Sequence, residues 1–498
     1  MFFKGRYIAV VARGMWHKLK HFLLENQTAR QTVMKNTFWL SVSQFFGRLL
    51  RSVIVIYAAR VLGATSWGAF SYALGLAAFL TIFSDIGITG LITRESSREP
   101  ELRYKLIATG IAIKLSLMGA AIIIFFVGAP LLTNSQEVLV LLPLVILLTA
   151  FDSLRDFTTS ITRSTERLET EAKNNIVTNI LIAGLGVAFL IVSPTSMALA
   201  LAYVTGSFLG TVWAIYIFRN YFLNAYRYFS KQLIKPILVS AWPFGLMGLM
   251  GSIMINTDLI MIGVFRGLTE VGYYSAAQRP IQLLYILPGL LAVPLFPLMS
   301  RSAYDREKFM AVLERGLSYV FIIALPLTAI GITLGKELML FFFGPEYAPA
   351  TAAFQILTIT ILTTFPGMIL GNAIFASKRE RKIITYTLLG VIGNFGFNLA
   401  FIPAYGMTGA AWSTVVTQFV SNAYLWWKVS GFLRISLLGR LVRPIIATLL
   451  VIILGAVGIA LGIHITVLLS VLSLIYVGLL LALKEPAIEE IASIIRQD

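Results

Sequence analysis

The chain has 498 residues, of which 58% are hydrophobic and 13% charged, and it carries a formal net charge of +17. Because soluble domains are about half apolar and a quarter charged, this composition excludes a soluble globular protein, and the positive-inside rule explains the excess of Lys and Arg better than a nucleic-acid partner does. The chain contains no cysteine and three scattered histidines, so we expect no disulfide, no metal site and no cofactor.

Residues 1–35 form a basic arm. Its apolar run YIAVVA is too short for a cleavable signal peptide, and no small-residue cleavage site follows it. Trp16, Leu19 and Phe22 recur at helical spacing among lysines and histidines, which predicts a cytoplasmic amphipathic helix on the membrane surface. Residues 220–237 have a similar composition and are predicted to form a second amphipathic segment, linking the two halves of the chain.

Fourteen apolar runs follow the arm, each long enough for a helix across a hydrocarbon core of roughly 30 Å. They lie near residues 36–62, 67–93, 106–129, 138–162, 174–192, 197–219, 238–264, 272–299, 317–335, 351–376, 383–402, 407–429, 442–462 and 465–483. A β-barrel would instead show alternating stripes of about ten residues. The sequence therefore predicts an all-α polytopic membrane protein.

Positive charge alternates between the connections. The second connection carries Arg94, Arg98, Arg103 and Lys105, whereas neighbouring loops such as GATS and SPTS are bare. By the positive-inside rule, both termini are expected on the cytoplasmic side of the cell membrane, and an even number of spans agrees with this.

A short motif recurs six spans apart, as RVLGATSWGAFSYA from Arg60 and as RGLTEVGYYSAA from Arg266. Since the interval is an even number of spans, the two copies have the same orientation in the membrane. This predicts two six-helix lobes around an axis along the membrane normal, with a central cavity between them. The N-lobe is expected at 36–219 and the C-lobe at 238–430, with spans 13 and 14 and the cytoplasmic C-terminus in 431–498.

Spans 1 to 12 resemble the polysaccharide transporter family, which includes the Wzx-type flippases of O-antigen and related lipid-linked glycans. The resemblance rests on RVLGATSWGAFSYALGLAAFLTIFSDIGITGLITRE, NTDLIMIGVFRGLTEVGYYSAAQRP, FFFGPEYAPATAAFQIL and YGMTGAAWSTVV. The family belongs to the multidrug/oligosaccharidyl-lipid/polysaccharide exporter superfamily.

The resemblance implies a V-shaped bundle that moves a polyprenyl-diphosphate oligosaccharide between leaflets by alternating access, coupled to an ion gradient. Membrane lipids, a glycan polymerase and glycosyltransferases are the partners that such a role implies. Spans 13 and 14 would form either a groove for the polyprenyl tail or a lipid-facing oligomer contact.

Nine ionisable residues fall within the predicted spans: Arg48, Arg51, Lys114, Arg155 and Arg279, and Asp85, Asp152, Asp156 and Asp258. Each costs roughly 2.5–3.5 kcal/mol near the bilayer centre, so each should face a partner or a wet cavity. Depth along the spans predicts that Asp85 pairs with Lys114. It likewise predicts that Asp258 pairs with Arg279. Asp152, Arg155 and Asp156 share one helix face at i, i+3 and i+4. The aspartates are either structural partners or sites that couple transport to H⁺ or Na⁺.

Arg48 and Arg51 have no evident partner of their own, although Asp152 or Asp156 could serve one of them. A diphosphate offers two anionic groups that accept bidentate hydrogen bonds from arginine. The resemblance and this chemistry agree in predicting a diphosphate site at Arg48 and Arg51, with Lys114, Arg155 and Arg279 as further candidates. Packing of a polar stripe is the alternative.

Amide side chains are candidates for contact with the sugars, because amides bond hydroxyls without requiring charge. They are Gln44, Asn175, Asn179, Gln282, Asn394, Asn398 and Gln418. The same side chains also hold membrane helices together, and the sequence leaves both roles open.

Three rival functions fit the sequence less well than a flippase. A drug or cation extruder of the same fold should have an acidic cavity, whereas these spans hold five cationic and four acidic residues. A glycosyltransferase or polymerase needs catalytic loops, and the outer loops here are too short and bare. A scaffold has little reason to keep arginines in a span. A transporter rather than an enzyme is therefore predicted, with the glycan and carrier lipid left open.

Overall fold

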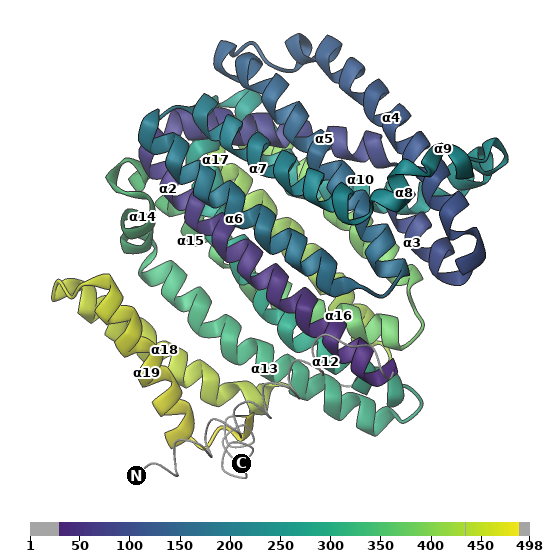
Figure 1. Ribbon diagram of the computed structural model, residues 1–498. Coiled ribbons are helices and arrows are strands. Elements are labelled where there is room, and N and C mark those ends of the chain that lie inside the picture. The colour runs from purple at the N-terminus through teal and green to yellow at the C-terminus, as the bar shows by residue number, and fades with distance from the viewer. Residues whose placement is uncertain (1–28, 434, 488–498) are drawn as a thin grey trace, which may run out of the picture.

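The computed structural model describes residues 29–433 and 435–487, and this part of the chain is built from helices without strands (Figure 1). Most of the predicted N-terminal amphipathic segment lies outside the described residues. The helices of the N-lobe are α2 (Ala29–Asp85), α3 (Ile88–Arg98), α4 (Arg103–Leu132), α5 (Gln136–Ser164), α6 (Leu168–Val192) and α7 (Ser196–Ile217).

The second half of the chain follows a short linker. Its helices are α10 (Ile234–Phe265), α11 (Leu268–Leu284), α12 (Ile286–Arg301), α13 (Arg306–Thr333), α14 (Gly335–Phe343), α15 (Thr351–Thr358), α16 (Ile361–Ala376), α17 (Arg381–Ser430), α18 (Leu438–Ala460) and α19 (Ile465–Ala482). The last two helices form a pair at the edge of the bundle, with α18 packed against α13 (Figure 1).

Twelve helices of the described chain are long and apolar enough to cross a membrane. Two of these, Phe38–Arg98 and Arg381–Ser430, are too long for one span, and each contains a glycine with positive φ. These are Gly63, with φ 74°, and Gly406, with φ 58°. Glycine adopts positive φ at little cost, so both residues mark tight turns. Dividing the two helices there is consistent with the fourteen spans predicted.

Two predicted elements are less continuous than expected. The eighth span consists of α11 and α12, which meet at Tyr285. Pro288 lacks the amide hydrogen that would bond the carbonyl of residue 284, which explains the break. The linker forms the short turns α8 (Arg219–Leu223), α9 (Ala225–Tyr228) and Lys231–Leu233 rather than one amphipathic helix.

The two copies of the repeated motif pack against each other. A Cβ on Gly68 would lie 1.9 Å from the carbonyl oxygen of Leu268, and a Cβ on Gly272 would lie 1.9 Å from the carbonyl oxygen of Ala64. Any side chain would therefore force the backbones apart. The glycines of the motif allow α2 and α11 to cross in direct backbone contact.

Hydroxyl groups extend this contact symmetrically. The side-chain oxygens of Thr65 and Thr269 lie 2.9 Å apart, and Ser275 donates a hydrogen bond of 3.1 Å to Ser71. In both pairs the partners are 204 residues apart in sequence. Corresponding residues of the two repeats thus meet each other, as they must on a pseudo-two-fold axis.

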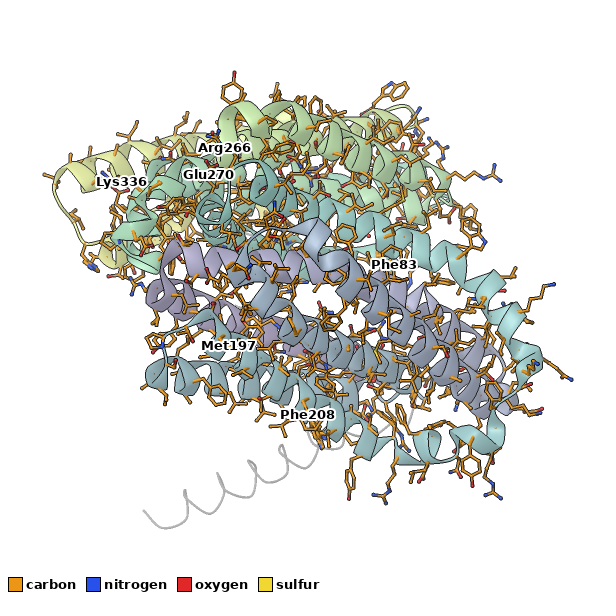
Figure 2. All side chains as sticks on the ribbon, turned by 90° about the horizontal axis from the view of Figure 1, so that it is seen from above. Phe83, Met197, Phe208, Arg266, Glu270 and Lys336 are labelled. Atoms are coloured by element: carbon orange, nitrogen blue, oxygen red, sulfur yellow. The ribbon has the colours of Figure 1, made fainter. Side chains whose placement is uncertain are left out.

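Further bonds close the same end of the molecule, which the charge pattern assigns to the outside. The carboxylate of Glu346 accepts the amide hydrogen of Ala64 at 2.7 Å, and the Tyr347 hydroxyl donates to the carbonyl of Ala59 at 2.9 Å. The neighbouring turn at residue 406 is held by Glu270, whose carboxylate accepts the amide of Met407 at 2.8 Å. Figure 2 shows Glu270 beside Arg266, with which it forms an ion pair of 3.1 Å.

At the opposite end of the bundle, the two halves of the chain pack closely on one side and loosely on the other. On one side α10 packs closely on both α2 and α3, whereas on the other side α12 makes little contact with α2. Phe46 and Leu49 on α2, and Val293 and Phe296 on α12, are exposed at this level. The lobes are therefore joined at the end that carries the motif contact and separated between α2 and α12 toward the opposite end.

Candidate functional site

The N-lobe holds two of the five predicted cations in ion pairs. The Lys114 ammonium lies 2.5 Å from the Asp85 carboxylate, which also accepts the hydroxyl of Thr89 at 2.5 Å. Lys114 is 1% exposed. The pairing predicted from depth along consecutive spans is confirmed, and this charge is neutralised within the lobe.

Arg155 is the second paired cation. Its guanidinium lies 2.8 Å from the Asp152 carboxylate, one turn earlier on α5, and donates to the Ser207 hydroxyl on α7 at 3.3 Å. Ser207 in turn donates to Asp152. The three side chains form a closed network between α5 and α7. The predicted shared face of residues 152 and 155 is thus confirmed.

Arg51 is held by an amide rather than by an acid. Its Nε donates a hydrogen bond of 2.6 Å to Oδ1 of Asn179 on α6. The Asn179 amide nitrogen donates to the backbone oxygen and to Oδ1 of Asn175, at 2.7 and 2.9 Å. This chain of bonds fixes the direction of Arg51 and leaves its charge unneutralised.

The space beside Asn179 depends on a glycine. A Cβ at Gly47 would lie 3.0 Å from the Asn179 amide nitrogen, so α2 and α6 can approach only where residue 47 is small. Sequence reasoning proposed Asn179 as a sugar contact. In the structure it supports an arginine.

Arg48 has no side-chain partner among the described residues, and it is exposed. Gln44 is exposed one helical turn away on the same face of α2. Residues 44, 48 and 51 follow the spacing i, i+4 and i+7, so they form one stripe along the helix. The predicted polar stripe of the first span is therefore present, and Arg48 extends it without a neutralising acid.

Three further side chains gather near Arg51. Asp156 is exposed, and it lies in electrostatic range of Arg51, Lys114 and Arg155. Arg279 lies in range of Arg51 and Tyr203, and its Nε is buried without a hydrogen-bond partner among the described residues. Spans 4, 6 and 8 thus place Asp156, Tyr203 and Arg279 each within electrostatic range of Arg51 on span 1.

Tyr203 was missed by sequence reasoning. It lies on α7 in electrostatic range of Arg51, Arg279 and Asp152, and its ring packs edge-on against Phe70 with centroids 5.3 Å apart. A single tyrosine in an apolar span is not distinctive. Only the convergence of its neighbours from other spans identifies it.

The predicted pair between Asp258 and Arg279 is wrong. Asp258 is 1% exposed, and its carboxylate accepts four hydrogen bonds from neutral groups. The donors are Tyr274 at 2.6 Å, Thr414 at 2.9 Å, Asn394 at 2.9 Å and Asn398 at 2.6 Å. Tyr274 and Arg279 lie five residues apart on α11, about 140° around the helix, so the face that meets Asp258 turns Arg279 away.

The remaining amide candidates have mixed surroundings. Asn394 and Asn398 are both buried, and their amide groups are bound to Asp258. The Gln418 side-chain oxygen accepts a bond of 3.2 Å from Asn422 on its own helix. Gln282 is partly buried on α11. Sugar contact by the amide candidates stays a prediction.

Residues 33–303 match a family model described as polysaccharide biosynthesis protein. The chain belongs to this family. The resemblance inferred from the sequence motifs is therefore confirmed, and the match extends from the first span into the C-lobe of this polysaccharide biosynthesis protein.

Two relatives are similar to this chain in sequence, and one solved structure is similar to it in fold. A relative named "Probable low-salt glycan biosynthesis flippase Agl15", from Haloferax volcanii, is 23% identical over 422 residues, covering 81% of this chain and 84% of the relative. The succinoglycan biosynthesis transport protein ExoT of Rhizobium meliloti is 26% identical over 339 residues, or 66% of each protein. The lipid II flippase MurJ in an inward closed conformation superposes with a TM-score of 0.71 over 88% of this chain and 97% of that chain, at 17% identity. The polysaccharide biosynthesis protein thus has a MurJ-like fold.

Proposed function

We propose that this protein is a flippase that moves a polyprenyl-diphosphate-linked oligosaccharide from the cytoplasmic to the outer leaflet, for the synthesis of a cell-surface polysaccharide. Family membership supports a role in polysaccharide biosynthesis, and the names of the two relatives support transport of a glycan. The observation that carries the proposal is that three arginines of the spans, Arg48, Arg51 and Arg279, form no ion pair in the described part of the chain, and that Arg51 and Arg279 lie in electrostatic range of each other.

Of the five cations predicted to bind the diphosphate, we retain Arg48, Arg51 and Arg279 in the proposed site. Lys114 and Arg155 are neutralised by Asp85 and Asp152. Arginine stays charged at any physiological pH, and an unpaired guanidinium away from water is unfavourable. A diphosphate provides adjacent anionic oxygens that accept bidentate hydrogen bonds, and would stabilise several arginines at once. Lys114 and Arg155 would take part only by changing partners as the lobes move.

The route follows from where the lobes are joined. The motif contact closes the outer end, and the separation between α2 and α12 would admit a lipid-linked substrate from the cytoplasmic leaflet. The polyprenyl tail would stay among the exposed apolar side chains while the diphosphate sugar enters the polar space. Alternating access then requires the outer contact to open. In this orientation both termini are cytoplasmic, in the cell membrane.

Ion coupling is assigned to Asp258. The side-chain oxygen of Asn398 is buried there without a hydrogen-bond partner among the described residues. Rotation of the Asn394 and Asn398 amides would turn their oxygens toward the carboxylate, which with the Thr414 hydroxyl makes an oxygen-rich site for Na⁺. Protonation of Asp258 is the alternative. Melting temperature measured with and without Na⁺ separates the two, since only a Na⁺ site gives a Na⁺-dependent rise that Asp258→Asn abolishes.

The test of flipping uses proteoliposomes with a fluorescent polyprenyl-diphosphate oligosaccharide. The fraction that reaches the opposite leaflet is measured for the native protein, for Arg48→Gln with Arg51→Gln, and for Arg98→Gln as a control. Arg98 is an exposed cation at the cytoplasmic end of α3, so this control removes charge away from the site. Loss of movement in the double variant alone supports the proposed site. If the double variant still moves the glycolipid, the protein remains a flippase but the arginines are not part of its binding site.

A cation extruder of the same fold is the second candidate, and the charges disfavour it. Arg48, Arg51 and Arg279 form no ion pair in the described part of the chain, and Asp156 lies in electrostatic range of Arg51. A cationic substrate would be repelled there. Efflux of a cationic dye without any movement of the glycolipid would reverse the ranking.

A further inference from the structure

Each lobe has a pocket at its cytoplasmic end, built from corresponding connections. The pocket of the N-lobe, about 750 Å³, is lined by the connections that follow spans 2, 4 and 6. The pocket of the C-lobe, about 580 Å³, is lined by those that follow spans 8, 10 and 12. The two pockets are therefore related by the same repeat as the motif on the pseudo-two-fold axis.

The helix ends inside the two pockets share one backbone conformation. In the N-lobe pocket the amide of Arg167 donates to the carbonyl of Thr162 at 2.8 Å, and in the C-lobe pocket the amide of Arg379 donates to residue 374 at 3.1 Å. Both arrangements place the preceding residue at positive φ, Glu166 at 57° and Lys378 at 55°. Glycine usually fills this position of a helix end. Here two charged residues of opposite sign fill it instead.

The N-lobe pocket carries charges of both signs. Its described lining includes Arg103, Arg163 and Arg167 and one carboxylate, Glu166. Arg163 donates two hydrogen bonds to the Glu171 carboxylate, at 2.8 and 3.1 Å. A phosphate group would meet negative charge there as well as positive.

The charged residues that line the C-lobe pocket are all positive in the described part of the chain. Its described lining includes Arg306, Lys378 and Arg379 and no acidic residue. Neither Arg306 nor Lys378 has an ion-pair partner among the described residues. Arg379 lies over the ring of Phe432 at 4.0 Å, a contact that orients the guanidinium without neutralising it.

We propose that the C-lobe pocket binds a phosphate group, carried by an anionic phospholipid of the cytoplasmic leaflet or by a soluble phosphate. The positive-inside rule accounts for cations at this end of both lobes, but the C-lobe pocket differs in that its described lining contains no carboxylate, whereas the lining of the N-lobe pocket contains Glu166. Tyr304, 91% exposed, and Phe375, 42% exposed, lie at the pocket and suit the interface between headgroups and acyl chains. They favour the lipid as the source.

The test compares purified full-length variants in detergent by native mass spectrometry, with phosphatidylglycerol and with phosphatidylcholine. Native protein should retain one phosphatidylglycerol in preference to phosphatidylcholine. Arg306→Gln should weaken this binding about fivefold, and Lys378→Glu, a change of two charges, about thirtyfold. Arg98→Gln, which removes a cytoplasmic cation outside the pocket, should bind as the native protein does.

A second arm replaces the lipid by inorganic phosphate and measures the rise in melting temperature. A rise that Lys378→Glu abolishes, without selective lipid binding, identifies soluble phosphate as the source. Equal binding by native protein, Arg306→Gln and Lys378→Glu in both arms overturns the proposal. Lys378→Glu should fold, because Glu166 already adopts the same backbone conformation at the corresponding helix end.

Discussion

Replacing Gly272 by alanine should shift the protein toward a state that is open at the outer end. The new Cβ would lie 1.9 Å from the carbonyl oxygen of Ala64, whereas a close carbon–oxygen contact is about 3.3 Å. The backbones of α2 and α11 must therefore separate by about 1.4 Å. Such a movement stretches the hydroxyl pairs Thr65–Thr269 and Ser71–Ser275 beyond hydrogen-bond distance.

The size of the shift follows from those two bonds. Each contributes about 1 kcal/mol net, so their loss favours the open state by about 2 kcal/mol, or roughly 30-fold in population. The native chain has no cysteine, so spin labels can be attached at Met197→Cys and Lys336→Cys alone. Met197 lies at the start of α7 and Lys336 at the start of α14 (Figure 2), and electron–electron resonance reports the distance between them.

Gly248→Ala provides the matched control, because a Cβ at Gly248 would have no neighbouring atom within 4 Å. We expect a longer-distance population in Gly272→Ala and the native distribution in the control. Identical distributions in all three proteins would refute the view that glycine contact holds the outer end closed.

Three further predictions concern single contacts. Asn179→Leu removes the only acceptor seen for Arg51 in the described chain, and should lower the initial rate of glycolipid flipping about tenfold with little change in melting temperature, since one bond to a charged group is worth about 1.5 kcal/mol. An unchanged rate would show that the arginine needs no support. Lys114→Met leaves Asp85, whose side chain is 25% exposed, without its ion-pair partner and should destabilise the protein by about 3 kcal/mol in chemical unfolding, with recovery in the double variant Lys114→Met and Asp85→Leu. Failure of the double variant to recover would contradict the pairing. Glu346→Gln weakens the bond to the N-lobe turn and should populate the longer distance between the outer spin labels, less strongly than Gly272→Ala. A native distance distribution would exclude a role in closure.

The spans could be predicted from sequence because each is a long apolar run, and the turns because glycine marks them. Gly63 and Gly406 divide helices that are otherwise continuous over 57 and 50 residues. The sequence also gives the depth of a residue along its span, and this was enough to predict the pair between Asp85 and Lys114. Depth does not give the direction around the helix, and for that reason Asp258 was assigned the wrong partner.

The candidate site was predictable only where charge marks it. Arg48 and Arg51 stand out in an apolar span, whereas Tyr203 has no charge to distinguish it. Asn179 shows a second limit. An amide bonds a sugar hydroxyl or an arginine equally well, and only the packing of α6 on α2 shows that the arginine is within reach.

The ion pair of Lys114 and Asp85 also constrains how the chain enters the membrane. The two residues lie on consecutive spans, 29 positions apart, and each alone would cost roughly 2.5–3.5 kcal/mol in lipid. Neither residue can meet its partner until both spans have entered the translocon. The second and third spans should consequently insert as a hairpin, with the ion pair formed before either helix is released to the bilayer. A contact that looks like local stabilisation in the finished bundle is thus also a condition on the order of its assembly.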